Sequence, residues 1–261
     1  MKRLALAPEH LDGPLTDLDV LAGNLADLGR INRVFGGVAL SRRAIEALVG
    51  GRADVGDSSL RLLDVGTGGA DIPVALIRAW RRRGARLSVT AIDSRPEVLD
   101  VAAAARASIG AGDDLRLELG DGLDLSYPDD AFAVAHASLV LHHLEPDEAV
   151  ALLREMARVA DRGVVINDLA RGWLPWLGAW LTLHLITRNR FTLHDGPLSV
   201  RRAYTVGEAR KLLARAGLRV VHQGAGFAGH RWALAAVPAA EPISANARTE
   251  VPPAQTSADL A

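Results

Sequence analysis

The sequence has no cysteine, and only two of its 30 basic residues are lysine, Lys2 and Lys211. Without cysteine the chain forms neither disulfides nor thiolate metal sites. It also has no apolar run of the roughly 18 residues that a membrane-spanning helix requires. The apolar run at its start ends at Pro8, too short for a secretory signal. We therefore expect a cytoplasmic protein without a transmembrane segment.

An excess of positive charge is also missing, because 30 Lys and Arg residues stand against 31 Asp and Glu residues and the net charge is -1. Proteins that bind nucleic acid through its phosphates are usually strongly basic, so we expect no nucleic-acid partner. Aromatic residues are few, at 4%, but 49% of the 261 residues are hydrophobic. This composition can fill the core of one large domain or two small ones.

Apolar segments alternate with helical patterns through the middle of the chain. Strands separated by helices indicate a parallel, doubly wound sheet, and hence a Rossmann-like α/β fold. The expected strands are 60–65, 87–93, 115–121, 131–140 and 163–168, and the expected helices between them are 71–84, 96–110 and 146–163.

The N-terminal part has a different pattern. Residues 15–50 show the leucine spacing of two helices, of which the second is expected to begin near Ser41 and to stop at Gly50. We expect residues 1–55 to form a helical lid over the site.

The C-terminal part is expected to add a helical insertion and an antiparallel strand to the sheet. The insertion is 169–203, and two strands follow at 219–227 and 229–237. The main domain is then 56–237, and 238–261, rich in Pro, Ala, Ser and Thr, is expected to be a disordered tail.

A glycine turn follows the first expected strand, in the segment LRLLDVGTGGADIP. Ligands of such sheets bind at the carboxyl ends of the strands, and glycines let a ligand approach the backbone closely. Gly66 and Gly68 fit the G-x-G-x-x-G pattern of dinucleotide sites, but its last position is Asp71. Asp71 and Asp64 would repel a pyrophosphate, so the turn suits a cationic ligand without phosphate, such as S-adenosylmethionine (SAM).

The next two expected strands also end in acids. Asp93 is placed to accept hydrogen bonds from two ribose hydroxyls, and Asp121 is placed to meet an adenine amino group. Acids or glycines at successive strand ends strengthen the prediction of a nucleoside site.

Residues 60–168 resemble the class I SAM-dependent methyltransferases. LLDVGTGGAD is similar to their first motif, VTAIDSRPEVLDVA to their second, and PDDAFAVAHASLVLHHL to their fourth-strand region. Ala70 replaces the third glycine of the first motif, and Ala133 replaces a frequent Asp. The resemblance implies SAM as cofactor, bound by Asp64, Gly66, Thr67, Gly68, Asp71, Asp93, Ser94, Asp121, Gly122 and Ser138.

The LHHL run after the fourth strand is similar to that of small-molecule O- and C-methyltransferases. The Asn-Pro-Pro or Asp-Pro-Pro run of enzymes that methylate bases is absent. The resemblance implies that His142, His143 and Asp168 lie at the acceptor, where a His can serve as base. The alternative is that the two histidines form a packed, hydrogen-bonded hinge.

The insertion is expected to shape a pocket for an apolar or aromatic acceptor with a hydroxyl group. Its candidate contacts are Trp173, Trp176, His194 and Asp195. The tryptophans could equally form the core of a helical lid or, with Arg188 and Arg190, a peripheral membrane contact. The segment 195–197 could be only a turn. This region also resembles methyltransferases found beside polyketide synthases, which act on phenolic or quinone-like lipids in secondary metabolism.

Two other functions compete with methyl transfer. One is a SAM-binding protein without turnover, and the other is a nicotinamide-dependent oxidoreductase, against which Asp71 argues. No metal site is expected, because His142 and His143 are adjacent and do not share a helix face as residues i and i+4 do. The sequence does not determine the oligomeric state or the methylated atom.

Overall fold

The computed structural model describes residues 1–5, 7–50, 60–108, 110 and 112–239. Their strands form one seven-stranded sheet in the order β3-β2-β1-β4-β5-β7-β6, in which only the pairs made by β7 are antiparallel. The expected Rossmann-like α/β class, with a mostly parallel sheet and an antiparallel C-terminal strand, is confirmed. The strands are β1 (Leu60–Val65), β2 (Leu87–Asp93), β3 (Leu115–Leu119), β4 (Val134–Ser138), β5 (Val164–Leu169), β6 (Leu218–Ala225) and β7 (Arg231–Pro238).

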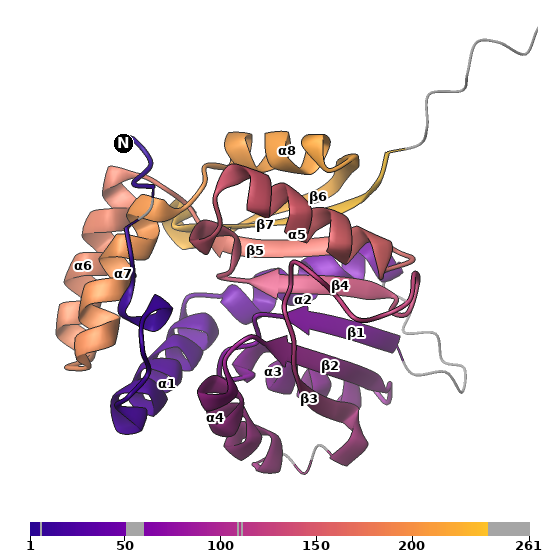
Figure 1. Ribbon diagram of the computed structural model, residues 1–261, viewed down its shortest axis with the longest axis horizontal. Coiled ribbons are helices and arrows are strands. Elements are labelled where there is room, and N and C mark those ends of the chain that lie inside the picture. Colours follow the sequence, from indigo (N-terminus) through magenta and orange to yellow (C-terminus); the bar gives the residue numbers. More distant parts are fainter. Residues whose placement is uncertain (6, 51–59, 109, 111, 240–261) are drawn as a thin grey trace, which may run out of the picture.

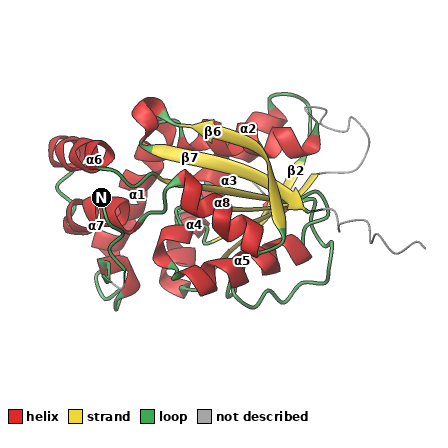
Figure 2. Ribbon diagram, turned by 90° about the horizontal axis from the view of Figure 1, so that it is seen from above, coloured by secondary structure: helices red, strands yellow, loops and turns green. Residues whose placement is uncertain are grey.

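Helices cover both faces of this sheet (Figures 1 and 2). One face carries α2, α3 and α4, and the other carries α5 and α8, so that two buried apolar clusters sandwich the strands. The helices are α1 (Leu18–Val34), α2 (Gly37–Val49), α3 (Asp71–Arg81), α4 (Pro96–Ala107), α5 (Pro146–Arg158), α6 (Trp173–Ile186), α7 (Arg190–Arg202) and α8 (Val206–Arg215), with short 3-10 turns η1 (His10–Asp12), η2 (Gly112–Asp114), η3 (Leu141–His143) and η4 (Phe227–Gly229).

The carboxyl ends of the parallel strands face a separate group of helices. Helices α1, α6 and α7 lie together beyond this end of the sheet, and η1 packs against α7 (Figure 1). The expected N-terminal cap and helical insertion after the fifth strand are therefore both present, and they bound the region where a ligand of such a sheet binds.

The N-terminal part departs from the expected boundaries. Helix α2 begins at Gly37 and not near Ser41, because Gly36 adopts a left-handed conformation, with φ 83°, that joins α1 to α2 directly. It ends at Gly50 as expected. Helix α2 packs on the sheet, so that only η1 and α1 stand near the strand ends.

The C-terminal part also differs in detail. The segment 195–197 lies inside α7 and is not a turn. The expected tail lies outside the described residues apart from Pro238 and Ala239, as does the domain boundary expected at 55–56. Among the helices of the described ranges, none has the length and apolar character needed to cross a membrane.

Candidate active site

A cavity of about 910 Å³ lies at the carboxyl ends of the strands, between the sheet and α1, α6 and α7. It is lined by all ten residues expected to bind the cofactor, namely Asp64, Gly66, Thr67, Gly68, Asp71, Asp93, Ser94, Asp121, Gly122 and Ser138. The loops after β1, β2, β3 and β4 each contribute, so residues far apart in the sequence come together at one edge of the sheet.

The glycine turn after β1 has the geometry of a backbone cradle. Gly66 and Gly68 have φ angles of 66° and 54°, a region that disfavours other residues. A Cβ on Gly66 would lie 2.5 Å from Val140 Cγ2. The buried hydroxyl of Thr67 has no hydrogen-bond partner among the described residues and lines the cavity. A narrow glycine backbone with an unsatisfied hydroxyl fits a bound nucleoside.

The acids after β2 and β3 are held by backbone amides. The two carboxylate oxygens of Asp93 accept hydrogen bonds from Gly68 N (3.0 Å) and Arg95 N (3.1 Å), and burial raises its pKa. Asp121 Oδ1 accepts from Leu123 N at 2.9 Å. The Asp93 carboxylate therefore has a fixed orientation at the cavity wall, as recognition of a ribose diol requires.

Asp64 begins a buried polar network. Because β1 and β4 pair with Asp64 opposite His136, the carboxylate accepts a hydrogen bond from His136 Nδ1. His136 Nε2 then accepts from the Ser41 hydroxyl at 2.8 Å, and the same hydroxyl accepts from Asn167 Nδ2 at 2.7 Å. Strands β1, β4 and β5 are thus tied to α2 beneath the cavity.

Arg231 continues this network to the second acid of the glycine turn. Its guanidinium donates to Asn167 Oδ1 and Asn32 Oδ1, both at 2.6 Å, and to Ser138 Oγ at 2.9 Å. Asn32 Nδ2 in turn donates to Asp71 Oδ2 at 3.0 Å. Burial lowers the pKa of Arg231 to about 10 and raises that of Asp71. The two acids that flank the glycine turn are therefore the two ends of one buried chain of hydrogen bonds.

His142, which lines the cavity, forms a pair with the buried Asp168. His142 Nδ1 lies 2.7 Å from Asp168 Oδ1, and the backbone N–H of His142 donates to Asp168 Oδ2 at 3.0 Å. Burial raises the pKa of Asp168, but the neighbouring His142 ring and its hydrogen bond outweigh this and hold the pKa below its usual value. When the ring is neutral, this hydrogen bond keeps its proton on Nδ1 and leaves a lone pair on Nε2, which lies on the side of Glu9.

The loop that carries the two histidines is strained. Leu139, directly after β4, has φ 60°, and its N–H donates to Asn167 O at 2.9 Å. A non-glycine residue in this region costs about 1–3 kcal/mol, which the surrounding structure must supply. The bend at Leu139 places His142 and His143 on η3 at the cavity wall.

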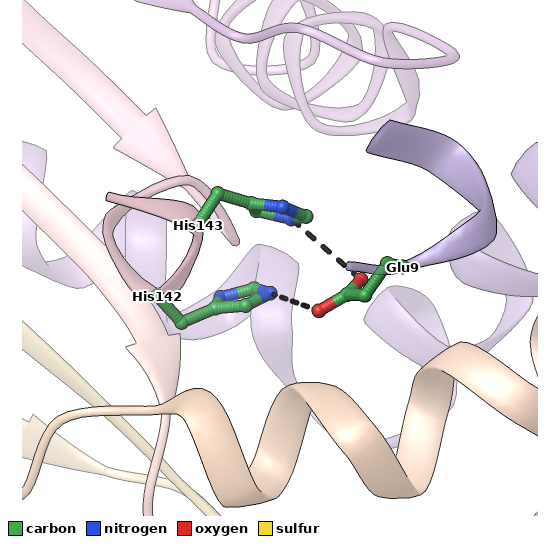
Figure 3. Close-up of side chains that lie close together, drawn as sticks. All are labelled: Glu9, His142 and His143. Atoms are coloured by element: carbon green, nitrogen blue, oxygen red, sulfur yellow. Dashed lines mark ion pairs between the residues drawn. The ribbon is translucent and has the colours of Figure 1, made fainter. Parts of the chain in front are cut away.

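The N-terminal segment adds carboxylates that sequence analysis missed. Glu9 is 4% exposed and lies 3.8 Å from His142 Nε2 and 3.9 Å from His143 Nε2 (Figure 3). Asp12 accepts from His143 Nδ1 at 2.9 Å and from Arg202 at 2.6 Å. Burial raises the pKa of Glu9 to about 6. Their only sequence signal was the pair of acids in PEHLD, near the start of the chain.

The candidate acceptor contacts of the insertion are only partly at the cavity. Trp173 and Trp176 do not line it, and Trp173 is 65% exposed. At about 100° per residue, Trp173 projects from the face of α6 opposite to the residues that line the cavity, whereas Trp176 lies beside Leu183, which lines it. Neither tryptophan lines the cavity, and their binding of substrate stays a prediction.

The adjacent residues His194 and Asp195 of α7 also differ in their position relative to the cavity. Asp195 lines the cavity and accepts from the backbone N–H groups of His10 (2.9 Å) and Leu11 (3.2 Å), so it holds η1 in place. His194 does not line the cavity, and its Nδ1 lies 2.7 Å from Asp195 Oδ1. Asp195 therefore lies at the cavity and holds η1, whereas His194 lies outside the cavity; contact of either residue with an acceptor stays a prediction.

Comparison with known proteins agrees with this geometry. Residues 62–163 match the family described as "Methyltransferase domain". Among curated proteins, ajmaline N-methyltransferase of Rauvolfia serpentina is 33% identical over 111 residues, which are 42% of this chain and 35% of that protein. The aligned region thus spans about a third of the relative's length.

Solved structures share the fold at low sequence identity. A SAM-dependent methyltransferase from Aquifex aeolicus is 18% identical, with 82% of this chain and 97% of that chain covered and a TM-score of 0.57. Magnesium protoporphyrin IX methyltransferase from Synechocystis, with bound SAH, is 20% identical, with 87% and 90% covered and a TM-score of 0.55. An O-methyltransferase family 2 protein from Planctomyces limnophilus, in complex with apigenin, is 24% identical, with 87% and 63% covered and a TM-score of 0.59.

The fold is therefore that of the class I SAM-dependent methyltransferases. Residues 62–163 match a methyltransferase domain, and solved methyltransferases, one of them with bound SAH, share the fold over 82–87% of the chain.

Proposed function

We propose that this chain transfers a methyl group from SAM to a hydroxyl group of a small, apolar or aromatic acceptor. One observation carries the proposal: the glycine turn with its acids and the His142 ring, backed by Asp168, line one continuous cavity. A methyl donor held at the turn and an acceptor held at His142 would therefore share a single enclosure, and such positioning supplies much of the rate enhancement.

The chemistry of the proposed transfer is an in-line displacement. SAM supplies an electrophilic methyl group: its S–CH₃ bond breaks as the O–CH₃ bond forms, and S-adenosylhomocysteine (SAH) is the second product. His142 Nε2 holds the acceptor hydroxyl and takes its proton, because Asp168 keeps the other ring proton on Nδ1. Asp168 is thus the positioning residue for His142.

The rest of the acceptor region is mainly apolar. Side chains from α1, α6 and α7 line it, including Leu28, Ile31, Leu183 and Val200. Apolar walls with a few polar groups favour an apolar molecule that carries a hydroxyl over a highly charged one. We propose further that η1 and α1 act as the lid of this cavity, since Leu25 of α1 lies against the glycine turn.

The test is methyl transfer to defined acceptors. The full chain is incubated with SAM and a panel of phenols and quinols, and with amines of matching shape, and methylated products are detected by mass spectrometry. The proposal predicts O-methylated products from the hydroxyl panel. Methylation of the amines alone would overturn the acceptor assignment, and SAH binding without any product would favour a SAM-binding protein without turnover.

A further inference from the structure

Three donor atoms from distant parts of the chain converge at the acceptor end of the cavity. They are one carboxylate, Glu9, and two imidazoles, His142 and His143, and their ligand atoms lie within 4.8 Å of one another (Figure 3). The separations from Glu9 to the two Nε2 atoms, 3.8 and 3.9 Å, are too long for hydrogen bonds. In the described part of the chain, neither Nε2 has a hydrogen-bond partner, so the three groups face one another without sharing a proton.

In both rings, the hydrogen bond of Nδ1 determines whether Nε2 carries a lone pair. His142 Nδ1 lies 2.7 Å from Asp168, and His143 Nδ1 lies 2.9 Å from Asp12. A neutral imidazole that donates from Nδ1 has a lone pair on Nε2. Metal-binding histidines show this same arrangement, in which a carboxylate receives the N–H opposite the metal. Both histidines therefore present lone pairs toward Glu9, each with its own orienting carboxylate.

The charges around the two histidines also favour a bound cation. Three carboxylates contact the two imidazoles, those of Glu9, Asp12 and Asp168. In the described ranges, Arg202 is the one guanidinium hydrogen-bonded to any of them, at 3.3 Å from Glu9 and 2.6 Å from Asp12. Its shorter contact is with Asp12, so that the contact of Arg202 with Glu9 is the weaker of the two. The carboxylates at the two imidazoles outnumber the guanidinium that bonds them, which favours a bound cation.

We propose that Glu9, His142 and His143 bind a divalent transition metal ion, with Zn²⁺ as the ion whose ligand chemistry they match. Zinc sites with three protein ligands of the His₂Glu type keep a further position open. Metal–ligand bonds of about 2.0–2.2 Å at tetrahedral angles place ligand atoms roughly 3.4 Å apart, so the Glu9 oxygens, now 3.8 and 3.9 Å from the two Nε2 atoms, would move closer to them.

The open position would face the cavity, because all three ligands line it. The use of that position rests on the proposed function: an acceptor hydroxyl bound there loses its proton more readily than a free one. In the metal-bound chain His142 is a ligand and the acceptor proton passes to solvent, whereas in the metal-free chain His142 Nε2 keeps the role of base proposed above. Binding of the metal itself does not depend on methyl transfer.

The test measures metal binding without SAM or acceptor. The full chain is freed of metals with a chelator and titrated with ZnCl₂ by calorimetry, and Co²⁺ is added to a second sample to record its visible absorption. We expect one Zn²⁺ per chain, a rise in Tm with added zinc, and the intense Co²⁺ bands of a four- or five-coordinate site. The nearly isosteric variant Glu9→Gln and the variant His143→Gln should each weaken Zn²⁺ binding at least about tenfold.

Two matched variants separate this site from other histidines. His194 belongs to a second cluster with His10 and Asp195, and His222 lies on β6 outside the cavity. His194→Gln and His222→Gln should bind Zn²⁺ like the wild type. Absence of binding to the wild type, unchanged binding by Glu9→Gln and His143→Gln, or loss of binding in His194→Gln would each overturn the metal site. SAH affinity, measured on every variant, shows whether the fold is intact. Zinc binding by a chain without methyl transfer would contradict only the proposed function.

Discussion

The cofactor end of the cavity is built from loops that each follow a strand of the sheet, whereas the acceptor end is assembled from segments far apart in the sequence. At the cofactor end, Asp64 and Asp93 stand at the carboxyl ends of β1 and β2. At the acceptor end, Glu9 of the N-terminal segment meets His142 of η3. The positions of the residues at the cofactor end follow from the order of the strands. The positions of those at the acceptor end depend on how the outer helices pack.

The two ends of the cavity also differ in the interactions that stabilise them. The cofactor end rests on a buried network in which Arg231 joins Asn167 of the sheet to Asn32 of α1. Breaking such a network leaves buried polar groups unpaired, which costs about 1–3 kcal/mol for each group. The acceptor end is held from outside by contacts of η1, such as those of Asp195 with His10 and Leu11. We therefore expect variants at the two ends to change different measurable quantities.

The largest effect is expected for His142→Gln. It removes the group that we propose to hold the acceptor hydroxyl, so turnover should fall about 10²- to 10⁴-fold, while SAH affinity should stay that of the wild type. Single-turnover kinetics and calorimetry with SAH give the two quantities. His222→Gln is the control. A loss of SAH affinity equal to the loss of turnover would mean that the two ends are not separate.

A smaller effect is expected for Asp93→Asn, and it should appear in SAH affinity and not in turnover. Hydrogen bonds to a charged group contribute about 1.5–3 kcal/mol, so SAH affinity should fall about 10- to 100-fold. Asp100→Asn, at an exposed position on α4, is the control, and calorimetry with SAH is the measurement. An unchanged affinity would remove Asp93 from the cofactor site.

Gly66→Ala tests the backbone of the same end. Its Cβ would approach Val140 at 2.5 Å, and φ at this position is 66°. The strain of about 1–3 kcal/mol should lower SAH affinity about tenfold and also lower Tm. Gly207→Ala, where a Cβ would meet nothing within 4 Å, should change neither. Wild-type SAH binding by Gly66→Ala would show that the turn does not form the cofactor cradle.

The smallest effect is expected for Trp173→Ala, because this side chain projects away from the cavity. An exposed residue outside the site should change kcat/KM by less than about twofold. Steady-state kinetics with an acceptor found in the panel would check this. A tenfold or larger rise in KM would restore Trp173 to the acceptor site and contradict the orientation of α6.

The same contrast explains what the sequence could predict. Strands β1 and β2 have the expected limits, 60–65 and 87–93, because short apolar runs that end in an acid and a turn have few alternatives. The cofactor residues follow from these strand ends. His136 and Arg231 were not predicted, since their partners are set by strand register and by the antiparallel return of β7.

The acceptor end could not be predicted for a different reason. Helix α6 carries large apolar side chains on all sides, including Trp180, Leu181 and Leu185, which are exposed. Without a polar stripe, periodicity cannot tell which face of a helix turns inward. Glu9 has no motif around it, and its proximity to His142 follows only from the packing of η1 against α7.

The most direct test of the account is calorimetric titration of the wild-type chain with SAM and SAH. The geometry of the glycine turn, with acids in place of a phosphate site, predicts micromolar binding of both and no binding of NAD. Absence of heat with SAM and SAH up to millimolar concentration, or binding of NAD in their place, would contradict the assignment of this cavity to SAM-dependent methyl transfer.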